Sequence, residues 1–330
     1  MPLPQKQPPE VVNLINLVNT HLKWKNLNGP PRGYEVYHPS AFGSCLRQMQ
    51  YQRYAERGLI ESEPSKPDPR MCRIWETGHI IQTRWEQYFI DMGVLRGYWK
   101  CRNPLCREYD DAGKHVGEPK EQPPKGPRVH GRDNKIGIFK PEKCNCGSCE
   151  FDYQEISVVD EDLNFHGHAD IILDFSNFDA SVYKTGNAVR MLFKENELPQ
   201  KPIVVDMKTI NSFKFRKLGA MPHFHYRVQL TIYTHILDLQ YGVLIYENKD
   251  NCDTKIYQVP RNEAMWKKIK EQANIMSEMV EEKKLPPPRP VSKESMDCGY
   301  CDFRSICHSS AVWNDPHLRE KRRKFYGDFR

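Results

Sequence analysis

The feature that most constrains this chain is the stretch Lys201–Thr209, whose apolar run Pro-Ile-Val-Val leads into Asp206-Met-Lys208. An apolar run of this length is typical of a strand. Alternate side chains of a strand share a face, so Asp206 and Lys208 point to the same side while Met207 turns into the core. The stretch therefore predicts a strand that presents a carboxylate and an ammonium group on one face. Such a pair can form part of a binding site for a divalent metal ion and a water molecule. Taken alone, an Asp-x-Lys pattern is also typical of a solvated strand face.

Helix and strand patterns alternate around this stretch. Helical spacing of apolar residues or helix-start signals occur in five segments, residues 9–25, 38–57, 73–89, 225–239 and 261–284. Strand patterns occur in residues 153–159, 165–175, 202–210, 243–247 and 255–259, the last two separated by a turn-rich tetrapeptide. The mixture predicts an α/β fold.

A second carboxylate suited to the same site is Asp170, at the end of the sequence His-Gly-His-Ala-Asp. Hard oxygen atoms are the preferred ligands of Mg2+ and Mn2+. Asp170, Asp206 and the backbone carbonyl of Met207 are therefore candidate ligands that leave positions for water and a phosphate oxygen. A bound ion lowers the pKa of such a water and neutralises charge on the phosphate. Each residue has an ordinary interpretation, such as a strand-end cap for Asp170, but the ordered set favours a phosphodiester-cleaving site.

Three motifs in this order resemble the PD-(D/E)XK nuclease superfamily, and specifically its RecB-type branch. They are Gly167-His-Ala-Asp170, Asp206-Met-Lys208 and Gln229-Leu-Thr-Ile-Tyr233. The resemblance implies a restriction-endonuclease-like core with a mixed central sheet flanked by helices. It also implies that Lys208 orients the attacking water or stabilises the transition state. Gln229 and Tyr233, one helical turn apart on one face, are implied to contact DNA and brace the active site.

The first motif of the branch is less regular in this chain. The branch usually has a histidine metal ligand four residues after a glycine, and counting from Gly78 leads to Gln82. A glutamine carbonyl is a weaker ligand for a hard cation than imidazole or carboxylate. We therefore keep His79 and Glu86 as alternatives to Gln82, although His79 is typical of a helix-surface residue.

Cysteines in the middle of the chain predict a zinc site. The chain has 11 cysteines, and in a reducing compartment their clustering indicates metal binding rather than disulfides. Residues 101–149 lack the apolar pattern needed to order themselves, and two short cysteine pairs around a tetrahedral zinc ion would supply the missing constraint. The alternative is a set of free thiols in an unordered insertion. The expected ligands are Cys101, Cys106, Cys146 and Cys149, with Cys144 or His130 as a substitute.

A second cysteine group near the C-terminus is Cys298-x2-Cys301-x5-Cys307. Four thiolates suit an iron–sulfur cluster and zinc equally well, so the spacing does not choose between them. With Cys45 far upstream, the group resembles the iron–sulfur staple of RecB-like nucleases found in CRISPR adaptation systems, the AddB subunit and bacteriophage exonucleases. That resemblance implies a structural 4Fe-4S cluster held by Cys45, Cys298, Cys301 and Cys307.

These segments predict four regions in the chain. They are an N-terminal helical region with the first cluster cysteine (1–100), a cysteine-rich zinc-binding insertion (101–150), a nuclease core (151–284), and an iron–sulfur C-terminal region with a basic tail (285–330).

Composition and charge add weaker constraints. The 49 Lys and Arg residues against 43 Asp and Glu give a formal charge of +6, which is compatible with a polyanionic partner and with an ordinary basic protein. The basic run 319–324 is either a phosphate contact or a solvated helix end. Because neither a signal peptide nor an apolar run of membrane-spanning length is seen, we expect a soluble cytoplasmic protein without a membrane partner.

The resemblance implies a deoxyribonuclease that depends on Mg2+ or Mn2+. We expect an exonuclease that acts on a DNA end or single strand in recombination, repair or phage DNA metabolism. If it is phage-encoded, it acts in the host cytoplasm. The alternative is a catalytically silent nucleic-acid-binding or scaffold protein of the same fold, which Gln82 at the histidine position favours. A zinc-only adaptor is a third possibility.

Overall fold

The structure is a computed structural model that describes residues 9–29, 33–61, 68–104, 106, 128–179, 198–289, 295–299 and 301–326, with the backbone alone at 9–13, 296 and 297. The chain divides into two compact units. We call them the helical unit, formed by Met1–Glu35, Cys45–Gln82 and Glu278–Phe329, and the sheet unit, formed by Val36–Ser44 and Thr83–Ser277.

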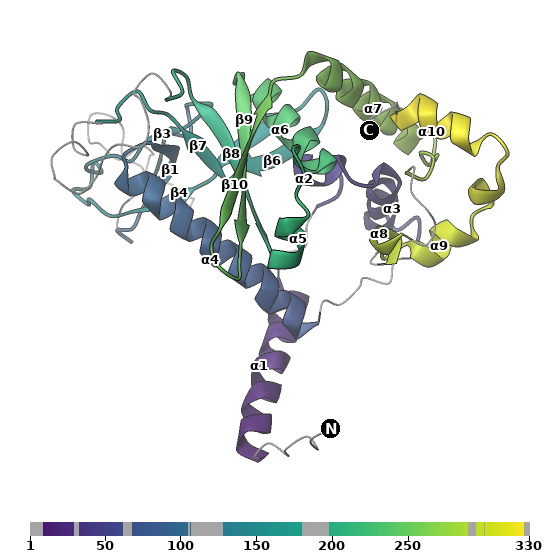
Figure 1. The fold of residues 1–330 in the computed structure, drawn as a ribbon, viewed down its shortest axis with the longest axis horizontal. Helices are drawn as coiled ribbons and strands as arrows, with labels where there is room; N and C mark the ends of the chain where they lie inside the picture. The colour runs from purple at the N-terminus through teal and green to yellow at the C-terminus, as the bar shows by residue number, and fades with distance from the viewer. Residues whose placement is uncertain are drawn as a thin grey trace, which may run out of the picture. The chain divides into compact units, whose positions relative to one another are not determined.

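A mixed sheet forms the centre of the sheet unit (Figure 1). Within the described residues it has eight strands in the order β10-β9-β8-β7-β1-β2, with β3 and β4 also paired to β1. Only β8 and β9 run parallel among these pairs. The strands are β1 (Leu95–Cys101), β2 (Val129–His130), β3 (Ile138–Phe139), β4 (Phe151–Gln154), β7 (Ile171–Leu173), β8 (Ile203–Ile210), β9 (Tyr241–Asn248) and β10 (Thr254–Pro260).

The parallel pair is connected by helix α6 (Phe224–Ile236), because parallel strands need a long crossover. In the β8–β9 register Asp206 lies beside Leu244 and Lys208 beside Tyr246, so these side chains share one face of the sheet. Helix α6 packs on that face, where Leu230 lies so close to Gly242 that a Cβ on the glycine would come within 2.9 Å of its side chain. The register therefore directs both predicted residues of β8 toward α6.

The opposite face of β9 is occupied by helix α4 (Pro69–Asp91). Glu247, which is 1% exposed, accepts hydrogen bonds from Arg84 at 2.5 Å and from the indole nitrogen of Trp85 at 2.6 Å. Burying this carboxylate is tolerated because both bonds satisfy it. The central sheet is thus flanked by helices on both faces, as the sequence predicts.

The strand predicted over residues 165–175 is divided in two at Asp170. Its first part, β6 (Phe165–Ala169), pairs with β5 (Ile156–Asp160) in a separate two-stranded ladder, and its second part, β7, joins the central sheet beside β8. Asp170 lies at the junction of the two ladders. Its side chain is consequently not held in a regular strand row, and it can turn toward the neighbouring strand β8.

The helical unit combines α3 (Leu46–Glu56) with segments from the C-terminal part of the chain. Buried Arg47 donates to the backbone carbonyl of Pro286 at 2.7 Å, and the Tyr54 hydroxyl donates to that of Lys284 at 2.7 Å. The ring of Tyr51 stacks on Phe303 with centroids 5.3 Å apart. The other helices of the unit include α1 (Pro9–Leu27), α8 (Met296–Gly299), α9 (Arg304–Ser309), the 3-10 helix η3 (Ala311–Asn314) and α10 (Leu318–Tyr326).

The remaining elements complete the sheet unit. They are α2 (Pro39–Phe42), α5 (Ser212–Arg216) and α7 (Glu263–Glu281), the last of which contributes residues to both units. In the described part of the chain, no helix has the length and hydrophobicity needed to span a membrane.

Candidate active site and metal centre

The carboxylate of Asp206 is the centre of a buried hydrogen-bond network between β8 and α6. Its Oδ1 accepts hydrogen bonds from Lys208 Nζ at 3.0 Å and from Gln229 Nε2 at 2.9 Å. The same Gln229 nitrogen lies 3.2 Å from the hydroxyl of Tyr233, which in turn donates to the backbone carbonyl of His168 at 2.7 Å. Four of the five predicted catalytic residues are therefore joined in one network.

Tyr233 also fixes the strand that carries Asp170. Its bond to His168 holds β6 against α6, and Gly167 beside it has no room for a side chain, since a Cβ would lie 2.8 Å from Pro39. A second tyrosine, Tyr153 on β4, donates to the backbone carbonyl of Asp170 at 2.6 Å. The backbone on both sides of Asp170 is thus held by buried hydroxyl groups, which positions its carboxylate.

Asp170 faces Asp206. Burial, followed by the charge of Asp206, raises the pKa of Asp170 well above its ordinary value. Glu155 and Glu86 raise it further, while Lys208 acts in the opposite direction. Burial likewise raises the pKa of Asp206, against the effect of Lys208. Three other carboxyl groups thus raise the pKa of Asp170, and the Lys208 ammonium group opposes them.

Within the part of the chain that the structure describes, two buried oxygen atoms at this site have no hydrogen-bond partner. They are Oδ2 of Asp206 and Oε1 of Gln229, both almost inaccessible to solvent. Leaving a buried carboxylate oxygen unsatisfied is costly, and a cation is the natural partner for it. The donor set, which consists of carboxylate and amide oxygens, suits a hard divalent cation such as Mg2+ or Mn2+.

Lys208 remains a cation in this environment. Burial acts to lower the pKa of Lys208, but the charges of Asp206 and Asp170 outweigh it and raise the pKa above the ordinary value. Its ammonium group also lies 5.0 Å from the ring centroid of Tyr226, a cation–π contact. The side chain is 22% exposed, so it is held in place yet reaches solvent.

One of the alternatives for the first motif, Glu86, has an electrostatic effect on the site. Glu86, in the sheet unit, acts on the pKa of both Asp170 and Tyr153. Gln82 is part of the helical unit, whereas Asp170 and Asp206 are part of the sheet unit. Its expected role as a metal ligand therefore stays a prediction. Glu155 and Tyr226 are site neighbours that no motif placed there, whereas Glu86 is one of the alternatives kept for the first motif. The only signal for Glu86 in the sequence is its position one helical turn after Gln82.

Replacing Asp170 with asparagine should raise the melting temperature of the metal-free protein. A carboxyl group with a raised pKa in the folded state keeps its proton where the unfolded chain has lost it, so it weakens folding increasingly as the pH rises above the ordinary value of 3.8. The variant lacks this penalty. In the presence of a chelator, its advantage over wild type should grow between pH 5 and pH 8, by about 2–4 °C for each kcal/mol relieved.

Asp174→Asn is a control with the opposite sign. Burial acts to raise the pKa of Asp174, but hydrogen bonds from Ser176 and Arg96 outweigh it and lower the pKa. This carboxylate therefore stabilises the fold above its ordinary pKa, and its replacement should lower the melting temperature at neutral pH. Scanning calorimetry measures both variants. Equal behaviour of the two would contradict the assigned environment of Asp170.

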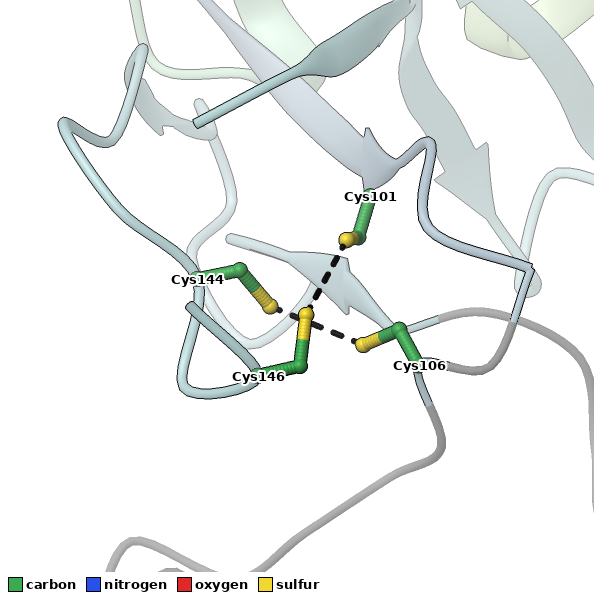
Figure 2. Close-up of side chains that lie close together, drawn as sticks. All are labelled: Cys101, Cys106, Cys144 and Cys146. Carbon is green, nitrogen blue, oxygen red and sulfur yellow. Dashed lines mark hydrogen bonds between the residues drawn. The ribbon is translucent and has the colours of Figure 1, made fainter. Parts of the chain in front are cut away.

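Four cysteines come together at the base of the cysteine-rich insertion. Figure 2 shows Cys101, Cys106, Cys144 and Cys146 pointing toward one another, and their sulfur atoms all lie within 4.8 Å of each other. The Cys101–Cys146 and Cys106–Cys144 sulfur distances are both 3.6 Å. Thiolates around a tetrahedral zinc ion lie about 3.8 Å apart, given zinc–sulfur bonds of about 2.3 Å. The group can therefore hold a metal ion.

The thiols of the group differ in pKa, because burial raises the pKa of Cys106 and of Cys144 whereas the pKa of Cys146 is lowered. Burial acts to raise the pKa of Cys146. Hydrogen bonds from the backbone of Ser148 and from the side chains of Cys106, Asn103 and Cys101 outweigh this effect and lower the pKa to about 6. A thiolate at neutral pH is the form that binds metals. His130 approaches from β2, with Nε2 3.2 Å from the sulfur of Cys144.

The observed group contains Cys144, the substitute, in place of Cys149. The chain turns tightly at residues 144–148, where the Cys144 nitrogen donates to the Ser148 carbonyl at 2.7 Å and the Gly147 nitrogen donates to the Cys144 carbonyl at 2.8 Å. Gly147 has a φ of +89°, a conformation that glycine adopts easily. This turn directs Cys144 and Cys146 to the same side and leaves Cys149 exposed. Residues 107–127 of the predicted insertion lie outside the described residues.

The thiols of the second cysteine group lie in the helical unit. Cys45 precedes α3, Cys298 is in α8 and Cys307 is in α9. Burial raises the pKa of Cys301 to about 11, and the charges of Cys45 and Cys307 contribute, so these three thiols act on one another. No three of the four sulfur atoms lie within 4.8 Å of each other, since the described residues contain that arrangement only at Cys101, Cys106, Cys144 and Cys146.

Comparison with known proteins finds similar solved structures, among them the following two. No protein-family model matches the chain, and no curated protein matches it. The structure of the protein SSO0001 aligns over 89% of this chain and 96% of its own, with a TM-score of 0.41 and 15% sequence identity. The alkaline exonuclease LHK-Exo from Laribacter hongkongensis aligns over 36% of this chain and 51% of its own, with a TM-score of 0.25 and 11% identity. Because both TM-scores are below 0.5, function is inferred below from the residues of this chain.

Proposed function

We propose that the sheet unit is a DNA nuclease of the PD-(D/E)XK type, similar to the RecB branch, and that it depends on Mg2+ or Mn2+. The observation that carries the proposal is the buried Asp206 carboxylate. One of its oxygens is bonded to Lys208, the other has no partner among the described residues, and the carboxylate acts electrostatically on a second carboxyl group, that of Asp170. The three residues come from two motifs that are separated in sequence. A structural ion pair would need Asp206 and Lys208, but not a second carboxyl group that raises the cost of burial.

Each residue has a defined part in this proposal. Asp170 and Asp206, with the Met207 carbonyl, hold the cation, and Glu86 adds negative charge on the α4 side. When bound, the cation supplies a more acidic water and offsets charge on the phosphate. Lys208 keeps its proton beside the phosphate, where it orients the attacking water or stabilises developing negative charge. Gln229 orients the Asp206 carboxylate, and Tyr233 holds the backbone just before Asp170.

The cysteine groups are proposed to be structural. Zn2+ is the ion we assign to Cys101, Cys106, Cys144 and Cys146, because four thiolates at tetrahedral spacing are typical of zinc. For Cys45, Cys298, Cys301 and Cys307 we propose a 4Fe-4S cluster. Thiols that act on one another but are too widely spaced for one tetrahedral ion support a larger group. Both groups require reduced thiols, which favours the cytoplasm as the site of action.

Replacing Cys301 with serine should separate the two groups. Protein purified without oxygen should be brown, and the variant should lose its iron and its visible absorption while it keeps its zinc. Metal analysis and an absorption spectrum check this. Wild-type protein that carries zinc at both groups and no iron would contradict the cluster and favour a zinc-only protein.

The nuclease proposal is tested with linear DNA labelled at either end and with closed circular DNA. Purified protein should degrade linear DNA in Mg2+ or Mn2+ and not in a chelator. Loss of the label from the ends before internal fragments appear would indicate an exonuclease, and an intact circle would agree with it. Linear DNA that stays intact with every cation tested would refute the proposal.

The silent scaffold protein is the second candidate, and Gln82 in place of the usual histidine is the observation that favours it. It predicts that DNA is bound but not cleaved in the same assay.

A further inference from the structure

A basic and aromatic surface lies directly after β8, on the short helix α5 and its C-cap. Phe213 is 59% exposed, and Lys214, Arg216 and Lys217 beside it are also exposed. The ammonium group of Lys217 lies 3.9 Å from the centroid of the Phe213 ring. None of these four side chains takes part in the buried network around Asp206. We call them the α5 surface.

The backbone of α5 is held firmly at its beginning. Asn211 caps the helix by accepting a hydrogen bond from the Lys214 nitrogen at 2.9 Å. The nitrogen and hydroxyl of Ser212 donate to the Asp250 carboxylate at 2.8 and 2.6 Å. Each of these bonds uses a group that would otherwise be unpaired at the start of a helix.

The end of the helix is held equally well from β10. Lys255 donates to the backbone carbonyls of Phe215 and Leu218, both at 3.4 Å, and the Tyr257 hydroxyl donates to that of Gly219 at 2.7 Å. The side chain of Phe215 points inward and is only 8% exposed. The fold therefore anchors the helix through Phe215 and leaves the Phe213 ring exposed, with the Lys217 ammonium group over it.

The charge of this surface identifies the class of partner. Residues 211–217 contain three cations and no acid, and the neighbouring Asp250 is already engaged by Ser212. Cations around an exposed aromatic ring are the combination that binds single-stranded nucleic acid, because the cations contact phosphates and the ring stacks on a base. A base pair inside a duplex has both faces covered, so a ring of this kind selects unpaired bases.

The surface is also close to the proposed active site. Phe213 follows Lys208 by five positions in the chain, so their Cα atoms are at most about 18 Å apart. At about 3.4 Å per nucleotide of a stacked strand, this distance corresponds to about five nucleotides. A strand bound by the α5 surface can thus continue to Asp206 and Lys208 without a long detour.

We propose that the α5 surface binds the single-stranded DNA substrate within about five nucleotides of the bond that is cleaved, with Phe213 stacked on a base. The inference deepens the proposed function and rests on it. It names the strand form of the substrate and the residues that select it.

The first test measures DNA binding in a chelator, so that it does not depend on cleavage. The full-length protein is titrated with a fluorescent single-stranded oligonucleotide and with the corresponding duplex. Phe213→Ala should weaken single-strand binding about tenfold and change duplex binding little. Phe213→Trp should retain single-strand binding, whereas Phe213→Leu, which keeps apolar bulk without a π face, should not.

The cations are tested with a matched pair of double variants. Lys214→Ala with Lys217→Ala should weaken binding and reduce its dependence on salt, as expected when phosphate contacts are lost. Lys267→Ala with Lys270→Ala removes two exposed lysines of α7 and should leave binding unchanged. Equal weakening by both pairs would mean that net charge alone matters, and this would overturn the inference.

Cleavage assays complete the test. Phe213→Ala should slow the cleavage of long single strands and leave that of substrates with two nucleotides on each side of the bond unchanged. The inference is overturned if Phe213→Ala slows the cleavage of long and short substrates equally. It is also overturned if the variant slows neither and binds single strands as wild type does. Both results leave the nuclease proposal intact. Phe213-dependent binding without any cleavage keeps the inference about the surface and refutes the nuclease. The inference is also overturned if Phe213→Ala leaves single-strand binding unaffected and instead abolishes dimer formation or binding to lipid vesicles.

Discussion

Lys208→Met is expected to reduce DNA cleavage by about 10²–10³-fold, the usual effect of removing one group that stabilises charge in a transition state. The substitution keeps the length and apolar body of the side chain and removes only the ammonium group. That group is held 3.0 Å from Asp206 and stays protonated because two carboxylates face it. The affinity for Mn2+ should change much less than the rate, because Lys208 is not a ligand.

Lys201→Met is the matched control, because Lys201 begins the same stretch of sequence and is exposed. It should cleave DNA at the wild-type rate. Single-turnover cleavage with saturating Mg2+ measures both variants. A Lys208→Met protein that cleaves as fast as wild type would show that the amine belongs to a structural ion pair and not to the reaction.

Cys106→Ser should remove the metal of the cysteine-rich insertion and unfold the residues around it. Structural zinc supplies much of the folding free energy of a small site, about 10–16 kcal/mol in isolated zinc-binding peptides. We expect the loss of about one zinc ion per chain and rapid proteolysis within residues 101–149. Cys106 is buried, with its sulfur 3.6 Å from that of Cys144.

Cys149→Ser is the control for this prediction, since Cys149 is exposed and lies outside the group. It should retain the zinc content and protease resistance of wild type. Zinc loss in Cys149→Ser together with retention in Cys106→Ser would restore the ligand set expected from the sequence and would contradict the observed arrangement.

The sequence predicts the centre of the fold well because its signals there are local. The strand around Asp206, the helix that carries Gln229 and the paired strands after it are continuous periodic segments, and they form β8, α6, β9 and β10. Asp206, Lys208, Gln229 and Tyr233 meet because one strand–helix crossover fixes their faces. For these residues, periodicity and order determine the geometry.

Other parts depend on contacts that no local pattern contains. Strand β1, which pairs with β7, β3 and β4, was not predicted, because Arg96 and Gly97 interrupt its apolar pattern. Arg96 is accommodated there by an ion pair with Asp174 at 2.8 Å. The division of the predicted strand at Asp170 likewise depends on pairing, because β6 pairs with β5 and β7 pairs with β8. Glu86 and Glu155 reach the site only through this packing.

The cysteines illustrate the same limit on a smaller scale. Spacing identifies the segment that gathers around a metal, but the choice between Cys144 and Cys149 depends on where the chain turns. Gly147 takes the positive φ that places the turn at residues 144–148. Both Cys-x-Cys and Cys-Gly-Ser-Cys are plausible metal-binding spacings, so the sequence leaves the choice open.

The central claim is that the buried pair Asp170 and Asp206 is a divalent-cation site. The most direct measurement is a titration of Mn2+ into wild type and Asp206→Asn, followed by electron paramagnetic resonance of the free ion at the same pH. Wild type should bind Mn2+ at this site with release of protons, since cation binding lowers the raised pKa of the carboxyl groups. Asp206→Asn should bind at least about tenfold more weakly. Equal binding by the two proteins, or none by wild type, would contradict the account.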